Sequence, residues 1–291
     1  MKASAFTYVR ATSVNNALEL LAVHGDRAKV LAGGQSLMPA MNLRLISPEF
    51  IVDIGELDEL RGIMVRDGTL IIGALTRHVD LLRSPALATH VPLLVEAVAH
   101  VAHPAIRNRG TLGGSLAHAD PASELPACML ALDATIVVRG ESAERRIASD
   151  DFFKGIYQTA LSANELLVAV EVPIGRMASV HFFHELARRH GDYAIVGLAA
   201  IAIVESGHFR SLRMAFFAVG DRPVLTKTAN RLLNVDVTSS LVSSVSAALG
   251  AELSPHDDQQ ASHAMRRHLA RVLFSRCVAA LLGRPELGNA S

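Results

Sequence analysis

Short apolar runs recur along the first half of the chain, each closed by glycine, proline or acidic residues, and this pattern predicts strands that alternate with helices. The clearest hairpin has Asp67-Gly68 between two apolar runs, because that pair suits the positive φ angles of a two-residue turn. The strands predicted in this half cover residues 28–31, 50–54, 62–66, 69–72, 135–138 and 166–172. The predicted helices cover 36–41, 85–101 and 123–132, and a loop of small residues is predicted at 115–122.

The second half of the chain has longer apolar runs and ends in helices. Residues 173–176 contain proline and glycine and form the best linker candidate, so we place a domain boundary there. A second hairpin is predicted around Ser206-Gly207. The strands predicted after the boundary cover 180–186, 200–204 and 212–219, and the last of two helices covers about 257–282.

The composition narrows the class of protein. Half of the 291 residues are hydrophobic, enough for a sizeable core and two or so domains. The 28 basic and 28 acidic residues balance, and no basic run exceeds Arg188-Arg189, so nucleic acid is not an expected partner. The longest apolar run, 194–204, is about half of the roughly 20 residues that a membrane span needs. No apolar signal segment stands within residues 1–10, so we expect a soluble cytoplasmic protein.

Metal chemistry within this chain is not expected. The two cysteines, Cys128 and Cys277, are too few for a four-thiolate iron–sulfur cluster, and neither belongs to a CxxC pair. The 13 histidines include no HExxH spacing, and His100 with His103 lacks a second ligand pair nearby. Any iron–sulfur cluster that serves this protein must therefore lie on another chain.

Two diglycine segments are the most informative features. In residues 31–37, the glycines free successive backbone N–H groups to point at one anion, and a helix start just beyond adds its own. Residues 111–115 repeat this chemistry with hydroxyl side chains, so two turns could grip one pyrophosphate. Each segment alone is equally compatible with a tight connection between elements. Neither GxGxxG nor GxxxxGK[ST] occurs, so a dinucleotide would be bound in some other way.

The sequence around these turns resembles a known family. LAGGQSLMPAMNLRL at 31–45 and IRNRGTLGGSLAHADPASELPA at 106–127 look like the two FAD-binding motifs of the FAD-binding medium subunit of molybdenum hydroxylases, the carbon monoxide dehydrogenase and xanthine dehydrogenase family. Segments 152–167 and 183–194 follow the family order as well. The resemblance covers the whole chain.

The resemblance implies an α+β fold. A FAD-binding domain of the PCMH type, built of two subdomains, would be followed by a C-terminal domain with an antiparallel sheet and flanking helices. We expect the first domain at 1–176, with the break between its subdomains near 55–60. The second domain, of the carbon monoxide dehydrogenase flavoprotein type, is expected at 177–291.

The same resemblance implies which residues hold FAD. Residues 30–37 and 111–115 would wrap the pyrophosphate and ribityl chain, and Glu124 would hydrogen-bond the cofactor, with Asp120 in the same loop. Tyr193 suits the isoalloxazine face, although a core tyrosine is the alternative. The implied cofactor-binding residues are Val30, Leu31, Ala32, Gly33, Gly34, Gln35, Ser36, Leu37, Val101, Ala102, Thr111, Gly113, Gly114, Ser115, Asp120, Glu124, Leu167, His184 and Tyr193.

Two departures from the family pattern stand out. Ser115 replaces a frequent Asn, and His184-Glu185 falls where many members place a Lys beside the flavin. Lower positive charge there would lower the flavin potential and make it depend more on pH. Arg107 and Arg109 suit either a phosphate or a solvated loop.

No nucleophile with a base and no carboxylate pair with a clear role is visible, so the hard chemistry belongs to the cofactor. The leading interpretation is an oxidoreductase subunit whose FAD takes electrons from [2Fe-2S] clusters on a small partner subunit and passes them to an acceptor such as NAD or a quinone. A large subunit would carry the molybdopterin. The alternatives are a self-contained FAD oxidase or reductase, and a scaffold that has lost the cofactor.

Overall fold

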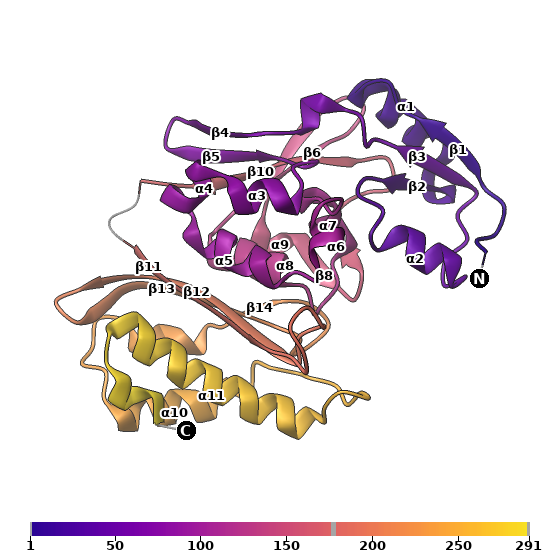
Figure 1. Ribbon diagram of the computed structural model, residues 1–291. Coiled ribbons are helices and arrows are strands. Elements are labelled where there is room, and N and C mark those ends of the chain that lie inside the picture. The colour runs from indigo at the N-terminus through magenta and orange to yellow at the C-terminus, as the bar shows by residue number, and fades with distance from the viewer. Residues whose placement is uncertain (1, 176–178, 290–291) are drawn as a thin grey trace.

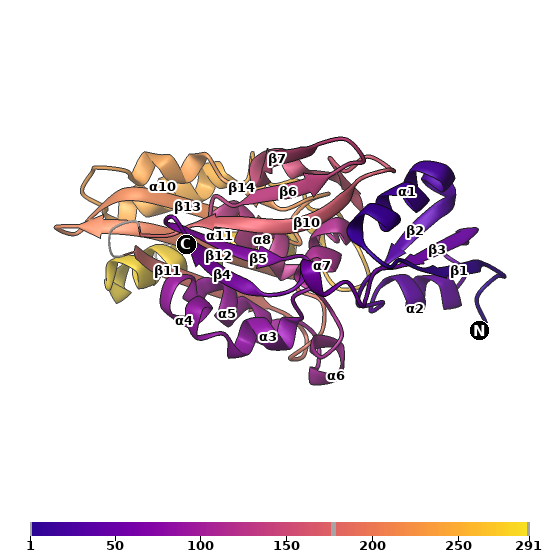
Figure 2. The same cartoon turned by 90° about the horizontal axis from the view of Figure 1, so that it is seen from above.

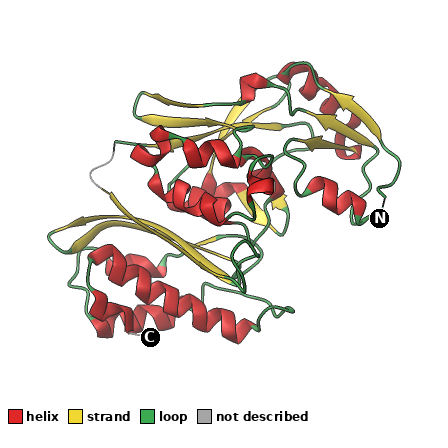
Figure 3. Ribbon diagram, viewed as in Figure 1, coloured by secondary structure: helices red, strands yellow, loops and turns green. Residues whose placement is uncertain are grey.

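Residues 2–175 and 179–289 are described by the computed structural model (Figure 1), and the predicted domain boundary between 176 and 177 lies outside the described residues. An N-terminal sheet lies beside a stack of layers: a second sheet, a layer of helices, a third sheet and a final pair of helices (Figures 1 and 3). This mixture of helices with largely antiparallel sheets confirms the α+β prediction.

The N-terminal sheet is parallel, in the order β1-β3-β2, and Figure 2 shows it at one end of the molecule. Its strands are short because each is a brief apolar run, and Val52 of β3 is fully buried. Ser13 caps α1 by accepting a hydrogen bond from Asn16 N. The elements are β1 (Thr7–Arg10), α1 (Val14–His24), η1 (Gly25–Arg27), β2 (Ala28–Leu31), α2 (Leu37–Asn42), β3 (Phe50–Asp53) and η2 (Asp58–Leu60).

The second sheet is antiparallel, in the order β4-β5-β10-β6-β7. Asp67 and Gly68 have φ of 49° and 72°, which confirms the predicted hairpin turn. Helices cover one face, where Leu70 and Ile72 of β5 are fully buried. The elements are β4 (Ile63–Arg66), β5 (Thr69–Gly73), α3 (His78–Arg83), α4 (Pro85–His90), α5 (Pro92–His100), α6 (Pro104–Arg107), α7 (Leu112–His118), α8 (Glu124–Ala131), β6 (Thr135–Arg139), β7 (Glu144–Ala148), α9 (Ser149–Phe152), β8 (Phe153–Gly155), β9 (Gln158–Thr159) and β10 (Leu166–Pro173).

The third sheet is antiparallel and buried on both faces, in the order β11-β12-β13-β14. On β12, Ala199 joins the core shared with helices α3–α5, α7 and α8, whereas Leu198 joins the core under α10 and α11. Continuous apolar strands result, as the long run from 194 predicts. The elements are β11 (Ser179–Leu186), β12 (Val196–Glu205), β13 (His208–Phe217), β14 (Val224–Leu225), η3 (Thr228–Leu232), α10 (Ser239–Leu249), α11 (His263–Leu282) and η4 (Pro285–Asn289).

Three sequence predictions of secondary structure are wrong. The helix predicted at 85–101 is broken at Val91 (φ −142°, ψ 56°), because the residue before Pro92 avoids the helical region. The loop predicted at 115–122 is helical up to His118. The last helix begins at His263 and not at 257, because Ser262 caps it.

Candidate cofactor site

The first diglycine segment is an open arc of backbone donors between β2 and α2. Among the described residues, the N–H groups of Gly33, Gly34, Gln35 and Ser36 donate to no other protein group. Gly34 supplies the positive φ of 72° that the turn requires, and the Gln35 side chain donates to Gly33 O at 2.9 Å. The segment therefore has the free donors that an anion such as a pyrophosphate needs.

The second diglycine segment is closed. Thr111 is the N-cap of α7, where its hydroxyl accepts from Gly114 N at 3.1 Å and its carbonyl accepts from Ser115 N at 3.0 Å. Leu112 N and Gly113 N donate to carbonyls of Thr76 and Ala74, at 3.0 and 2.8 Å. The expectation of a second open turn is therefore wrong, whereas contact of the predicted residues 111, 113, 114 and 115 with FAD stays a prediction.

The two segments nevertheless meet. A Cβ added to Gly33 would lie 2.3 Å from Arg109 O and 2.9 Å from Gly110 Cα. One added to Gly114 would lie 3.8 Å from Ala32 Cβ. The absence of a side chain at Gly33 lets the end of β2 approach the residues just before α7, so the open donors border the second segment.

Arg107 is partly buried and holds a strained turn. Its Nη1 donates to Val101 O at 2.8 Å and to Ala102 O at 2.9 Å. Ala102 has φ of 43°, which costs free energy for a residue other than glycine. Its carbonyl would lie 2.9 Å from a Cβ on Gly191. The predicted residues Val101 and Ala102 thus adjoin the loop that leads to Tyr193.

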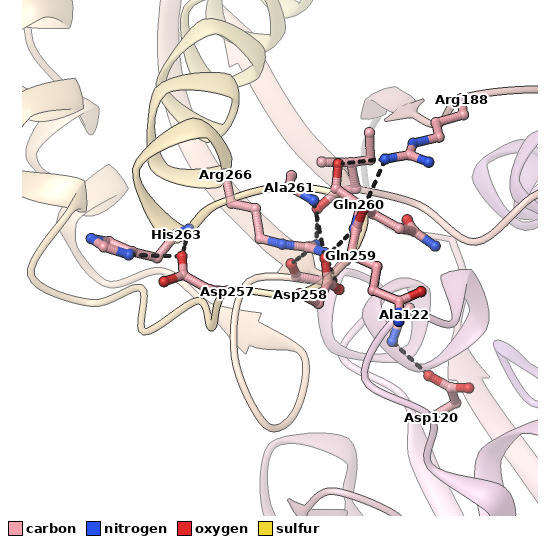
Figure 4. Close-up of polar contacts among 12 residues, drawn as sticks. Asp120, Ala122, Arg188, Asp257, Asp258, Gln259, Gln260, Ala261, His263 and Arg266 are labelled. Atoms are coloured by element: carbon pink, nitrogen blue, oxygen red, sulfur yellow. Dashed lines mark hydrogen bonds and ion pairs between the residues drawn. The ribbon is translucent and has the colours of Figure 1, made fainter.

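Acidic and aromatic side chains gather on the far side of α7. Asp120 is buried, and its Oδ1 accepts from Ala122 N at 2.9 Å (Figure 4). Burial, followed by the charge of Asp120, raises the pKa of Glu124 to about 7. Tyr193 is 63% exposed, so it is not a core tyrosine. Partial burial and then the charge of Asp120 raise the pKa of its phenol and that of Tyr157.

The side chains of His184 and Glu185, which depart from the family pattern, point to opposite faces of strand β11. The Glu185 side chain is 4% exposed, and its Oε1 lies 3.3 Å from Nδ1 of His100 on α5. Burial, followed by the charge of Glu124, raises the pKa of Glu185 to about 8. His184 points to the other face, where its ring lies 6.3 Å from that of Phe182. The structure brings Glu185, and not His184, to the acidic cluster.

Two further placements bear on the site. Leu167 is 4% exposed within the core, so its predicted contact with flavin or adenine stays a prediction. Sequence reasoning missed His78, which is buried behind Gly110 and has no hydrogen-bond partner for either ring nitrogen among the described residues. Burial lowers the pKa of His78 to about 4. No periodicity or motif marks this histidine in the sequence.

The described residues fit FAD. Free N–H groups at 33–36 suit its pyrophosphate, and the exposed face of Tyr193 suits an aromatic ring. Glu185 Oε2 is a buried oxygen without a partner in the described chain, as expected where a polar group completes a site.

Comparisons with known proteins agree with this geometry. Residues 4–175 match the family described as the FAD binding domain in molybdopterin dehydrogenase, and residues 181–281 match the CO dehydrogenase flavoprotein C-terminal domain. The chain belongs to the FAD-binding subunits of molybdenum hydroxylases. This flavoprotein subunit binds FAD and is an oxidoreductase component.

The relatives of the flavoprotein subunit share its full length. A 6-hydroxypseudooxynicotine dehydrogenase complex subunit alpha of Paenarthrobacter nicotinovorans is 40% identical, over 98% of this chain and 97% of its own. Caffeine dehydrogenase subunit beta of a Pseudomonas species is 36% identical, over 96% and 95%. The carbon monoxide dehydrogenase structure from Hydrogenophaga pseudoflava superposes with a TM-score of 0.95 at 35% identity, over 98% and 99%.

Metal-ligand clusters and membrane-spanning helices are both absent from the described residues. They contain no group of three or more His, Cys, Asp or Glu side chains that could hold a metal ion. Across the same part of the chain, no helix is long and apolar enough to cross a membrane. Cys128 and Cys277 are both buried as free thiols.

Proposed function

We propose that the flavoprotein subunit carries electrons from the [2Fe-2S] clusters of a small subunit to an acceptor such as NAD or a quinone, within a complex whose large subunit holds molybdopterin. Bound FAD supplies the exchange between one-electron and two-electron chemistry. The observation that carries the proposal is the open arc of N–H groups at 33–36 in a chain that matches molybdenum hydroxylase flavoproteins over nearly its whole length. We place the complex in the cytoplasm.

Each part of the site has a role in this proposal. The N–H groups at 33–36 bind the pyrophosphate, and the adjoining second segment, 111–115, lines the ribityl chain. Tyr193 covers the isoalloxazine, while Asp120 and Glu124 accept hydrogen bonds from the cofactor. The remaining predicted contacts, Val30, Leu31, Ala32, Leu37, Val101, Ala102, Leu167 and His184, belong to the same proposal. So do the domain limits 1–176 and 177–291, with a break near 55–60.

The large subunit would select the substrate. The relatives are named for caffeine, for 6-hydroxypseudooxynicotine and for carbon monoxide, which are unlike molecules. A flavoprotein fold shared by all of them is not tailored to one substrate. We therefore assign no substrate pocket to this chain.

Reduction of the flavin with and without partner chains tests the proposal. The purified chain should hold one noncovalent FAD that a small organic substrate does not reduce. Co-purification from the native source should bring two further chains with iron and molybdenum, and the flavin should then be reduced on substrate addition. Direct substrate reduction of the isolated chain would favour the self-contained oxidase instead.

A further inference from the structure

Arg266 on α11 is a buried hydrogen-bonding hub of the C-terminal half. Its side chain is 7% exposed, and its Nη2 donates to Asp258 Oδ2 at 2.6 Å. Its Nη1 donates to Ala218 O at 3.0 Å and also to Ile195 O. Figure 4 shows Arg266 reaching from the first turns of α11 toward the segment that carries Asp258. One guanidinium thus joins the beginning of β12, the end of β13 and the loop before α11.

Two of these partners connect Arg266 to the proposed FAD site. Ile195 comes two residues after Tyr193 in the chain. Ala218 donates its N–H to Pro121 O at 2.8 Å, and Pro121 follows Asp120. Of the two carbonyls that Arg266 holds, the Ile195 carbonyl lies in the segment of Tyr193, the aromatic wall of the site. The Ala218 carbonyl lies in a residue whose N–H binds the loop of Asp120, the acidic wall of the site.

The loop before α11 also contacts the loop that leads to Tyr193. Arg188, in the loop that precedes Tyr193, donates from Nη2 to Gln259 O at 2.9 Å and to Gln260 O at 3.1 Å. Asp258 Oδ1 accepts from the N–H groups of Gln260 at 2.8 Å and Ala261 at 3.0 Å (Figure 4). The pair Asp258–Arg266 therefore also fixes the carbonyls to which Arg188 binds.

An arginine suits this place for a physical reason. Its planar fork presents several N–H donors in fixed directions, whereas a lysine ammonium is a single point on a flexible chain. A buried cation needs a counter-charge and partners for its donors. Asp258 and two backbone carbonyls supply them for Nη1 and Nη2, whereas the buried Nε has no partner among the described residues. Removal of the fork leaves buried carbonyl groups without their partner.

We propose that Arg266 is a positioning residue that sets the spacing between the Tyr193 loop and the Asp120 loop, and that the C-terminal domain controls FAD affinity through it. The inference rests on the proposed placement of FAD against these two loops. It gives α11 a role at the site, because α11 itself contributes no residue to the predicted contacts with FAD.

Arg266→Lys in the full chain is the first test. Lysine keeps the charge but loses the fork, so the aligned arrangement of the two loops should fall to about one molecule in ten, and the Kd for FAD should rise about tenfold. The Kd is measured by titrating the apoprotein with FAD, and Tm is measured on the same samples. Arg271→Met is the matched control, because Arg271 lies on the same helix and contacts Ser246 instead. It should leave the Kd unchanged.

A double-mutant cycle with Tyr193→Ala separates positioning from general support of the fold. If Arg266 acts through the Tyr193 loop, its substitution should weaken FAD binding much less in the Tyr193→Ala background. Full additivity of the two losses, or a Kd of Arg266→Lys within twofold of wild type, would overturn the inference. Wild-type affinity in Tyr193→Ala alone would instead refute the proposed placement of FAD.

Discussion

The two diglycine segments look alike in sequence and differ in structure. Gly33 and Gly34 lie in a turn whose N–H groups remain free, whereas Gly113 and Gly114 lie in the first turn of α7 with their N–H groups already bound. The first pair is needed for donor access and a positive φ. The second pair is needed because a Cβ on Gly113 would lie 2.6 Å from Ala74 Cβ and one on Gly114 would lie 2.8 Å from the Thr111 hydroxyl. The same dipeptide thus leaves its N–H groups free in one place and bound in the other, while Gly33 and Gly113 both allow close packing.

The first segment should be the more sensitive to a single methyl group. Gly33→Ala places a Cβ 2.3 Å from Arg109 O, a backbone atom that cannot move aside cheaply. We expect the unfolding free energy to fall by about 1–3 kcal/mol and the purified protein to lose most of its FAD. Flavin absorbance after gel filtration and thermal unfolding measure the two effects.

Gly250→Ala is the matched control for this change. Its added Cβ would meet only Ala247 O, at 3.7 Å, which is ordinary contact. Full FAD content in Gly33→Ala would show that the end of β2 does not border the cofactor.

The sequence was sufficient for elements that one local pattern determines. The strand at 28–31 and the hairpin at Asp67-Gly68 are confirmed because an apolar run and a turn pair each determine their own structure. The closed state of the second segment could not be predicted. Its partners, the carbonyls of Ala74 and Thr76, stand about 40 residues earlier and are brought there only by tertiary folding.

The candidate site shows the same difference between features that local sequence patterns determine and features that tertiary contacts determine. Family motifs predicted the glycines, which lie where the two segments meet, and Asp120, which is buried beyond the end of α7. They could not predict that Arg107 binds the carbonyls of 101 and 102, nor that Arg266, from the far end of the chain, fixes the walls. Long-range hydrogen bonds of this kind leave no periodic trace in a single sequence.

Thr111→Val tests the structural role of the second segment. The change keeps the shape of the side chain and removes the oxygen that caps α7, so stability should fall by about 1 kcal/mol. Thr111→Ser is the control that restores the cap. Chemical denaturation measures both variants. Unchanged stability of Thr111→Val would mean that the closed segment does not depend on its cap.

Ser36→Ala tests the open segment, where we expect a change in FAD affinity without a change in stability. Ser36 is exposed and makes no capping hydrogen bond, so Tm should not change. A hydroxyl that donates to the cofactor is worth about 0.5–1.5 kcal/mol, so the Kd for FAD should rise about two- to tenfold. Together with Thr111→Val this makes a crossed pair, with one variant losing stability and the other affinity. A loss of Tm without a change in Kd would reverse the assignment of the two segments.

The smallest expected effect concerns the pH dependence of stability that comes from the buried carboxyl of Glu185. Burial raises the pKa of Glu185 from 4.5 to about 8, so the folded chain holds a proton there that the unfolded chain has released. Its contribution to stability is fully present below pH 4.5 and is lost as pH rises through about 8. Glu185→Gln stays neutral at every pH, so its Tm should match wild type near pH 5 and exceed it by about 2 °C at pH 8.

Glu165→Gln is the control of opposite sign, because Arg145 lowers the pKa of Glu165. That variant should lose stability at pH 8, and parallel Tm profiles of wild type and Glu185→Gln from pH 5 to 9 would show that Glu185 is charged when folded.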